Sequence, residues 1–240
     1  MLARDLVVYE NTQFSRMTAR GELAATHENG LSVLDYTPNG RSDYFYQRSI
    51  RKKRIVLHFT AGFLGGDLST LTKTDYHVSV PFVIARDGRI YRLFNTKYWS
   101  YHLGRAAIGG NKTCSSTSLG IELSNIGPLD KSGNWMWNAY GSKYCRITET
   151  EYYDTGPEYR GYKNFAKFTD AQYSALNELL TVLCVKHDIL RTYLPKTRRF
   201  KEFSSPSQGR GFKGICSHVN YRKYGKTDIG PMFDWTKIGA

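Results

Sequence analysis

The sequence predicts an α/β domain, because segments with strand character and a long amphipathic helix occur along the same chain. Residues 54–59 form an apolar run typical of a buried strand. Residues 80–94 place Asp87 and Gly88 between two β-rich runs, which is a strong hairpin signal. Residues 169–188 repeat apolar side chains at helical spacing. At 240 residues the chain is long enough to bury one such core without disulfides.

The predicted first strand leads into a glycine-rich turn and a short helix. Residues 62–66 form the turn, and Asp67 directly after them is a predicted N-cap of the helix. His58 therefore lies where a strand meets a loop. From such a position a side chain can reach a cleft, since loops at the ends of strands carry many functional residues.

A further strand and the long helix follow the hairpin. Residues 119–124 are predicted to form the strand. The helix begins with Thr169 and Gln172, which have the spacing of a capping box, and it should end near Asp188. It should cover one face of the sheet with the apolar residues Tyr173, Leu176, Leu179, Leu180 and Leu183.

Two segments have no assigned place in this pattern. Residues 1–50 mix polar, charged and aromatic side chains with little sustained period, and either an appended hairpin or a wrap around the domain would suit them. Residues 128–166 form an insertion rich in tyrosine, tryptophan and glycine. Their aromatic side chains would either stack on sugar rings or pack against one another, and the sequence leaves both open.

The composition narrows the possible partners. A formal net charge of +13 favours adsorption to polyanions, which include nucleic acid, anionic lipid and bacterial wall polymers. Because no nucleic-acid-binding motif is present, no nucleic-acid partner is expected. The cysteines have no C-x-x-C spacing, so we expect free thiols at Cys114, Cys145, Cys184 and Cys216.

Neither a leader nor a membrane span is predicted. Residues 1–10 carry charges inside their only apolar run, whereas a signal peptide needs an uninterrupted apolar core. No segment approaches the roughly 20 apolar residues of a membrane-spanning helix. We therefore expect a protein that stays in the cytoplasm of the cell that makes it and does not insert into a membrane.

Four blocks of sequence occur in the order typical of one enzyme family. They are residues 54–62, 78–91, 118–123 and 218–235. Together they resemble the zinc N-acetylmuramoyl-L-alanine amidases, which share a fold with peptidoglycan-recognition proteins. The resemblance implies an α/β fold with a mixed central β-sheet flanked by helices. It also implies that residues 51–240 form the zinc amidase catalytic domain, with the aromatic-rich insertion at about 128–166, and it assigns no role to residues 1–50.

The resemblance further implies a zinc site. His58, His218 and Asp228 match the ligands of the family. Two imidazoles with one carboxylate leave the fourth position of a tetrahedral zinc ion free for water. Asp234 is a rival carboxylate for the third ligand, but it also fits the start of a closing helix, where a role as N-cap would explain it.

Three more residues receive roles from the resemblance. Glu122 matches a glutamate that acts as general base and then as general acid. Lys226 matches a lysine that faces the developing oxyanion, where a fixed donor is worth on the order of 3 kcal/mol. His102 resembles a substrate-binding histidine at the rim of the groove. Val80 stands where the short phage amidases carry a tyrosine, so the sequence resembles the branch of the family that uses the glutamate.

The implied function is hydrolysis of the amide bond between N-acetylmuramic acid and the L-alanine of the stem peptide in peptidoglycan. The leading interpretation is a monomeric phage endolysin, made in the host cytoplasm and acting on the cell wall after its release. Two alternatives stay open: a bacterial muropeptide-recycling amidase, and a peptidoglycan-binding module without catalysis. Binding modules of this fold typically lack a zinc ligand, whereas all three matching residues are present here.

Overall fold

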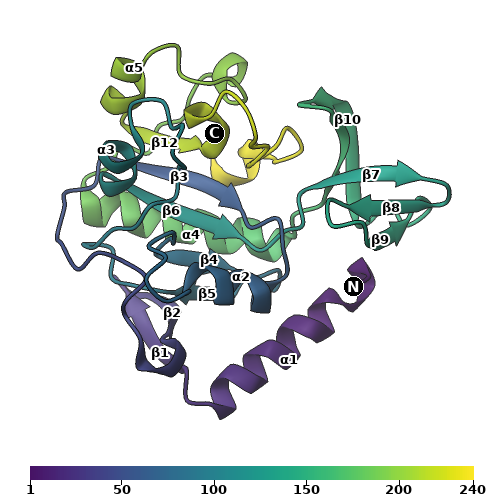
Figure 1. The fold of residues 1–240 in the computed structure, drawn as a ribbon, viewed down its shortest axis with the longest axis horizontal. Coiled ribbons are helices and arrows are strands. Elements are labelled where there is room, and N and C mark those ends of the chain that lie inside the picture. Colours follow the sequence, from purple (N-terminus) through teal and green to yellow (C-terminus); the bar gives the residue numbers. More distant parts are fainter.

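The computed structural model describes residues 1–240 and contains two β-sheets (Figure 1). The central sheet consists of β1 (Leu23–Glu28), β2 (Leu31–Tyr36), β3 (Arg54–Phe59), β4 (Phe82–Ile84), β5 (Ile90–Arg92), β6 (Ser118–Leu123) and β12 (Gly214–Ser217). Its strand order is β1-β2-β5-β4-β6-β3-β12. Strands β4, β6, β3 and β12 are parallel, while β5 is antiparallel to β4. The predicted α/β fold with a mixed central sheet is therefore confirmed.

The helices include the predicted long one. The α-helices are α1 (Leu6–Ala19), α2 (Leu64–Leu71), α3 (Asn111–Ser116), α4 (Asp170–His187) and α5 (Pro206–Gly211), and short 3₁₀ helices lie at Ala3–Asp5, Pro38–Gly40, Lys196–Arg198, His218–Tyr221 and Trp235–Ile238. Helix α4 begins with the predicted capping box. Thr169 Oγ1 accepts from the amide of Gln172 at 3.1 Å, and Gln172 Oε1 accepts from the amide of Thr169 at 3.2 Å. Because the first turn leaves its amides without helical partners, these bonds fix where the helix begins.

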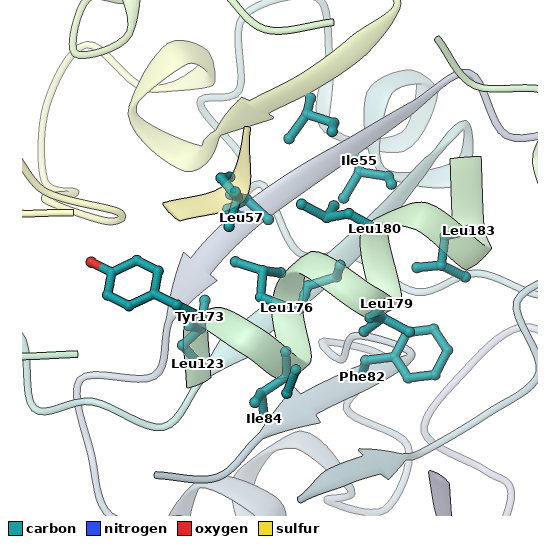
Figure 2. Packing of buried hydrophobic residues seen from close by; sticks show 14 of the residues in the cluster. Ile55, Leu57, Phe82, Ile84, Leu123, Tyr173, Leu176, Leu179, Leu180 and Leu183 are labelled. Atoms are coloured by element: carbon teal, nitrogen blue, oxygen red, sulfur yellow. The ribbon is translucent and has the colours of Figure 1, made fainter. Parts of the chain in front are cut away.

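Helix α4 covers one face of the central sheet (Figure 2). Ile55 and Leu57 of β3 pack with Leu176 of the helix, and all three side chains are fully buried. Burial of each such side chain contributes about 1.5–3 kcal/mol. Since side chains alternate between the two faces of a strand, His58 points to the face that α4 leaves free.

The predicted hairpin is present, but the role predicted for Asp67 is wrong. Strands β4 and β5 pair antiparallel, and Gly88 in their turn has a φ of 88°, a conformation that favours glycine. Helix α2 begins at Leu64 with Phe63 as its N-cap, so Asp67 lies inside the helix. Its buried carboxylate has Oδ2 3.3 Å from Ser124 Oγ, a tertiary contact that a local capping signal does not reveal.

The N-terminal segment joins the central sheet. Strands β1 and β2 form a hairpin, and β2 pairs in parallel with β5. Tyr44 is buried and donates its hydroxyl hydrogen to the Leu93 carbonyl oxygen at 2.6 Å. Met17 of α1 belongs to the same apolar cluster. Residues 1–50 thus supply both a sheet edge and core side chains, while the proposed domain boundary at residue 51 stays a prediction.

The aromatic-rich insertion folds as a second, five-stranded sheet. Its strands are β7 (Pro128–Ser132), β8 (Trp135–Asn138), β9 (Lys143–Arg146), β10 (Tyr153–Tyr159) and β11 (Tyr162–Ala166). They pair antiparallel in the order β10-β11-β7-β8-β9, beside the central sheet and near the N-terminus (Figure 1). Lys143 Nζ lies 4.8 Å from the ring centroid of Trp135 and 5.7 Å from that of Trp137. These tryptophans therefore stack with a cation from their own sheet.

The cysteines are buried free thiols, as predicted. Cys216, two residues before His218, has its Sγ 3.8 Å from the Ile55 carbonyl oxygen in the interior, so its surroundings are structural. None of the helices combines the length and the apolar character that crossing a bilayer requires.

Candidate metal centre

Neighbouring parallel strands bring the candidate residues to one edge of the central sheet. His58 is the penultimate residue of β3, and its Cα partner on β6 is Glu122. On the other side of β3, strand β12 ends at Ser217, and His218 begins the 3₁₀ helix that follows (η4). The carboxyl ends of parallel strands meet at one edge of a sheet, which is where ligands of α/β proteins bind.

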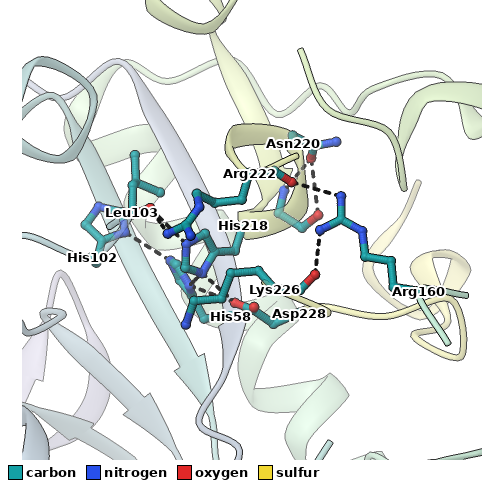
Figure 3. A network of polar contacts seen from close by, with 10 residues as sticks. His58, His102, Leu103, Arg160, His218, Asn220, Arg222, Lys226 and Asp228 are labelled. Atoms are coloured by element: carbon teal, nitrogen blue, oxygen red, sulfur yellow. Dashed lines mark hydrogen bonds and ion pairs between the residues drawn. The ribbon is translucent and has the colours of Figure 1, made fainter. Parts of the chain in front are cut away.

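His58, His218 and Asp228 converge on one point (Figure 3). His58 Nδ1 lies 3.0 Å from His218 Nδ1 and 3.0 Å from Asp228 Oδ2. His218 Nδ1 lies 2.8 Å from the same carboxylate oxygen. All three side chains are buried. The fold thus assembles the three residues that the sequence resemblance selected as metal ligands.

A chain of hydrogen bonds determines which nitrogen of His58 carries the proton. The carbonyl oxygen of Cys114 can only accept, so Ser118 Oγ donates to it at 2.7 Å. Ser118 Oγ then accepts from His102 Nε2 at 2.8 Å, which leaves Nδ1 of a neutral His102 without a proton. That nitrogen accepts from His58 Nε2 at 3.0 Å. Nδ1 of a neutral His58 is therefore unprotonated and has a free lone pair.

The second histidine is oriented in the same way. His218 Nε2 donates to the Leu103 carbonyl oxygen at 3.1 Å, so the Nδ1 of a neutral His218 has a free lone pair. Two such lone pairs and the Asp228 carboxylate would repel one another at these distances unless a cation lies between them. Neutral imidazole and carboxylate are ligands that zinc accepts. The donor set fits a divalent metal ion with a position left for water or substrate.

The electrostatics agree with a neutral His58, a neutral His102 and an ionised Asp228. Burial, followed by the proximity of His218, lowers the pKa of His58 to about 4. Burial and the neighbouring His58 hold the pKa of His102 well below its ordinary value. Burial alone would raise the pKa of Asp228, but the two histidines outweigh it and lower that pKa. These are the protonation states that metal binding requires.

The loop that carries Lys226 and Asp228 is tied to the body through its backbone. The amide of Val219 donates to the Asp228 carbonyl oxygen at 3.0 Å. Arg160, from the turn between β10 and β11, donates to the carbonyl oxygens of Arg222 and Lys226 at 2.8 and 2.5 Å (Figure 3). The second sheet therefore helps to hold the metal-ligand loop in place.

Glu122 and Lys226 line a cavity of about 250 Å³ together with His218 and Asp228. Glu122 Oε2 is buried and has no hydrogen-bond partner within the protein. Burial, and then the Asp228 carboxylate, raise the pKa of Glu122 well above its ordinary value. Such a carboxylate is a good proton acceptor when ionised, which suits a general base. Lys226 is an exposed side chain of the same cavity.

His102 and Asp234 have different surroundings from the three candidate metal ligands. His102 is buried and bonds to His58, and it also lines the 250 Å³ cavity. The contact between His102 and substrate remains a prediction. Asp234 is the N-cap of the 3₁₀ helix Trp235–Ile238 (η5), and its carboxylate accepts from the Thr236 amide at 3.0 Å. Asp234 is therefore outside the metal-binding cluster.

Sequence reasoning missed the residues that hold the cluster in place. Ser118 sets the proton on His102, and Arg160 holds the loop that carries Asp228. Their partners are 16 and 62 residues away along the chain. No local motif connects residues at such separations, so only the fold identifies them.

Comparison with known families agrees with the fold. Residues 48–231 match the sequence model of the N-acetylmuramoyl-L-alanine amidase family. The chain belongs to this family. The matched range includes the candidate residues His58, His102, Glu122, His218, Lys226 and Asp228.

A curated relative is the N-acetylmuramoyl-L-alanine amidase AmiD of Escherichia coli (strain K12). The two sequences are 28% identical over 193 residues. The match covers 78% of this chain and 52% of AmiD, so the chain spans about half the length of that relative.

Two solved structures share the fold. One is AmiD from E. coli with the substrate anhydro-N-acetylmuramic acid-L-Ala-D-gamma-Glu-L-Lys, at a TM-score of 0.51 and 23% identity, covering 89% of this chain and 64% of that chain. The other is AmpDh3 from Pseudomonas aeruginosa in complex with anhydromuramic pentapeptide, at a TM-score of 0.50 and 17% identity, covering 80% of this chain and 60% of that chain. At these levels of sequence identity, the similarity shows a shared fold and nothing more.

Proposed function

We propose that this chain is a zinc-dependent N-acetylmuramoyl-L-alanine amidase, which hydrolyses the amide between N-acetylmuramic acid and the L-alanine of the stem peptide. The convergence of His58, His218 and Asp228 within 3.0 Å carries the proposal. Membership of the amidase family supports the type of reaction. Glu122, the register partner of His58, supplies a base beside the metal ligands.

The hydrogen bonds decide which atoms would hold the ion. His58 and His218 would bind through Nδ1, because their Nε2 atoms donate to His102 and to the Leu103 carbonyl. Asp228 would bind through Oδ2. A zinc ion held by these atoms would lower the pKa of a bound water molecule and polarise the amide carbonyl of the substrate. The outer hydrogen bonds keep both imidazole rings in the tautomer that binds metal.

Glu122 and Lys226 would move the proton and stabilise the charge. Glu122 takes the proton from the attacking water and delivers it to the departing amino group of L-alanine. Its unpartnered Oε2 and raised pKa suit both steps. Lys226 donates to the substrate oxygen on which negative charge develops, a contribution on the order of 3 kcal/mol.

Peptidoglycan is the proposed partner. The structurally similar AmiD was solved with a substrate in which anhydro-N-acetylmuramic acid precedes L-Ala. The net charge of +13 adds a long-range attraction to the anionic polymers of the wall. This attraction should weaken as salt shortens the reach of the charges.

Within this class we propose a phage endolysin that acts on the host wall. The charge supports this choice, because it favours a polymeric anionic substrate over a small soluble one. A bacterial muropeptide-recycling amidase would instead prefer soluble muropeptides, so the ratio of rates on sacculi and on soluble muropeptide separates the two. The complete set of His58, His218 and Asp228 argues against a module that binds without cutting.

Digestion of purified sacculi tests the proposed reaction. We expect new free amino termini of L-alanine and no new reducing sugars, because the proposed bond is an amide and the glycan stays intact. New reducing ends would identify a glycosidase and contradict the proposal. His218→Ala is the control and should release neither product.

A further inference from the structure

A second pocket opens beside the metal centre. The cavity lined by His218 and Asp228 measures about 250 Å³, and an adjoining cavity measures about 390 Å³. Thr60, Leu71 and Glu122 line both of them. The two cavities are therefore parts of one groove, and Glu122 lies at their junction.

Two aromatic residues of this side pocket come from the segments to which the sequence resemblance assigned no role, while the rest of its lining comes from residues 60–71 and Glu122. Tyr9 belongs to α1, which precedes the family match over residues 48–231. Tyr140 lies in the turn between β8 and β9 of the aromatic-rich insertion. It is 69% exposed, so its ring is available to a ligand. The N-terminal helix and the second sheet thus meet over the same pocket.

Helix α1 is fixed in this place by a buried carboxylate. Glu10, next to Tyr9, is 1% exposed, and its Oε2 accepts from the Arg86 amide at 2.8 Å. Its Oε1 lies 3.4 Å from Ser124 Oγ, which is also 3.3 Å from Asp67 Oδ2 in the floor of the pocket. The ring of Tyr9 packs edge-on against Phe63 at 6.3 Å between centroids. Tyr9 is therefore held as a wall of the groove.

The chemistry of the side pocket suits a neutral sugar ring. Its lining includes three aromatic rings, from Tyr9, Phe63 and Tyr140, and two carboxyl groups, from Asp67 and Glu122, but no lysine, arginine or histidine. Aromatic rings present flat apolar faces, and carboxylates accept hydrogen bonds from hydroxyl groups. A carboxylate of a ligand would find no cation in this pocket with which to pair.

The other side of the metal centre carries positive charge. In the sheet order β6-β3-β12, Glu122 lies on the β6 side of His58, whereas the segment after β12 carries Arg222 and Lys226. Arg222 Nη1 lies 3.4 Å from the Leu103 carbonyl oxygen, to which His218 also donates. A separate cavity of about 770 Å³ has a mainly basic lining, with Arg198, Lys201, Arg210 and Lys223 and one acidic residue, Glu202. Anionic groups of a substrate are favoured on this side.

We propose that the pocket between Tyr9 and Tyr140 binds the pyranose ring of the muramoyl group, and that the anionic stem peptide extends toward Lys226 and Arg222. The inference rests on the proposed amidase function, and it fixes the direction in which the substrate lies across the metal centre. Tyr9 and Tyr140 are then determinants of specificity for the sugar.

Two soluble compounds test the assignment. One is N-acetylmuramoyl-L-Ala-D-γ-Glu-L-Lys, and the other is D-lactyl-L-Ala-D-γ-Glu-L-Lys, which keeps the scissile amide and lacks the sugar. Their Kd values are measured by calorimetry on the Glu122→Gln protein, with and without Tyr9→Ala or Tyr140→Ala. We expect each tyrosine change to weaken binding of the sugar-bearing compound about tenfold and that of the sugarless compound less than about twofold.

Two further variants separate binding from folding. Tyr9→Phe keeps the ring, so it should bind the sugar-bearing compound within about twofold of the parent. Tyr76→Ala removes another exposed tyrosine, which lies outside both cavities, and should change neither Kd. If Tyr9→Ala and Tyr140→Ala weaken the binding of both compounds equally, or weaken only that of the sugarless compound, the proposal is overturned. These Kd values are measured without hydrolysis, so they test the sugar site alone. A wild-type protein without hydrolytic activity would refute the proposed amidase function and would leave the result for the sugar site unchanged.

Discussion

His58 and Glu122 are direct Cα partners in the parallel pairing of β3 with β6. Neighbouring strands of a sheet lie about 4.8 Å apart, so the sheet itself sets the spacing between a candidate metal ligand and the candidate base. Both side chains alternate with residues that pack under α4, and so both point to the uncovered face. These two side chains are therefore held by strands, which position reacting groups better than loops do, whereas Asp228 and Lys226 lie on a loop that hydrogen bonds tie to the body.

Glu122→Gln should keep the fold and the metal but lose most of the activity. The amide fills the same space and cannot accept and return a proton, so we expect a loss of about 10²- to 10⁴-fold in kcat. Initial rates on sacculi and metal content are measured on the same preparations. An activity within about threefold of wild type would assign Glu122 a structural role.

His102 should act by orienting His58. His102→Leu removes the acceptor for His58 Nε2, and we expect zinc affinity to fall by about 10- to 100-fold. His102→Gln supplies an acceptor oxygen and should keep most of the affinity. Competition with a chelator measures the zinc affinity of both variants. If the leucine variant binds zinc as tightly as wild type and shows a raised KM, His102 contacts substrate and the orienting role is refuted.

Gly120 should be intolerant of a side chain. A Cβ at this position would lie 2.5 Å from Val80 Cγ1 and 3.1 Å from His102 Nδ1. We expect Gly120→Ala to cost about 1–3 kcal/mol of unfolding free energy, measured by urea denaturation. Gly211→Ala is a matched control with nothing within 4 Å of the added atom, and it should change stability by less than about 0.5 kcal/mol. Equal effects of the two changes would contradict the close packing.

Glu10 should make the protein less stable as pH rises. Burial raises the pKa of Glu10 from its ordinary value of 4.5 to about 7. The folded protein then binds this proton more tightly than the unfolded chain, so stability falls between about pH 4.5 and 7. Glu10→Gln removes this titration, and the stability of the variant relative to wild type should rise by on the order of 2–3 kcal/mol over that window.

Urea denaturation of the wild-type and Glu10→Gln proteins at a series of pH values measures this difference. Asp67 and Glu122 remain in both proteins, so their own titration cancels in the comparison. Parallel pH profiles would show that Glu10 contributes nothing to the pH dependence of stability.

The candidate metal ligands could be predicted because their sequence blocks resemble those of the family, and the main helix could be predicted because its signals are local. Thr169 and Gln172 are three residues apart, so the capping box is visible in the sequence. His218 and Asp228 are separated by ten residues in one recognisable block, and His58 is the penultimate residue of a mainly apolar strand. The apolar residues next to His58 and along the helix are also buried in the core, so the sequence pattern and the folded structure agree there.

The walls of the groove could not be predicted, because they depend on contacts between distant segments. Glu10 pairs with the amide of Arg86, which is 76 residues away. Asp67 follows a glycine-rich turn and has a plausible local role as N-cap, but its partner Ser124 is 57 residues away. An acidic side chain near a turn has the same local pattern whether it caps a helix or is buried under another one.

The metal content of the purified protein tests the central claim most directly. After dialysis against a weak chelator, elemental analysis of the wild-type protein and of His218→Ala gives the number of zinc ions per chain. We expect one zinc in the wild-type protein and a large loss in the variant, because His218 supplies one of three converging ligand atoms. Equal zinc in both proteins, or none in a wild-type protein that still hydrolyses sacculi, would contradict the assignment of this cluster as the catalytic metal centre.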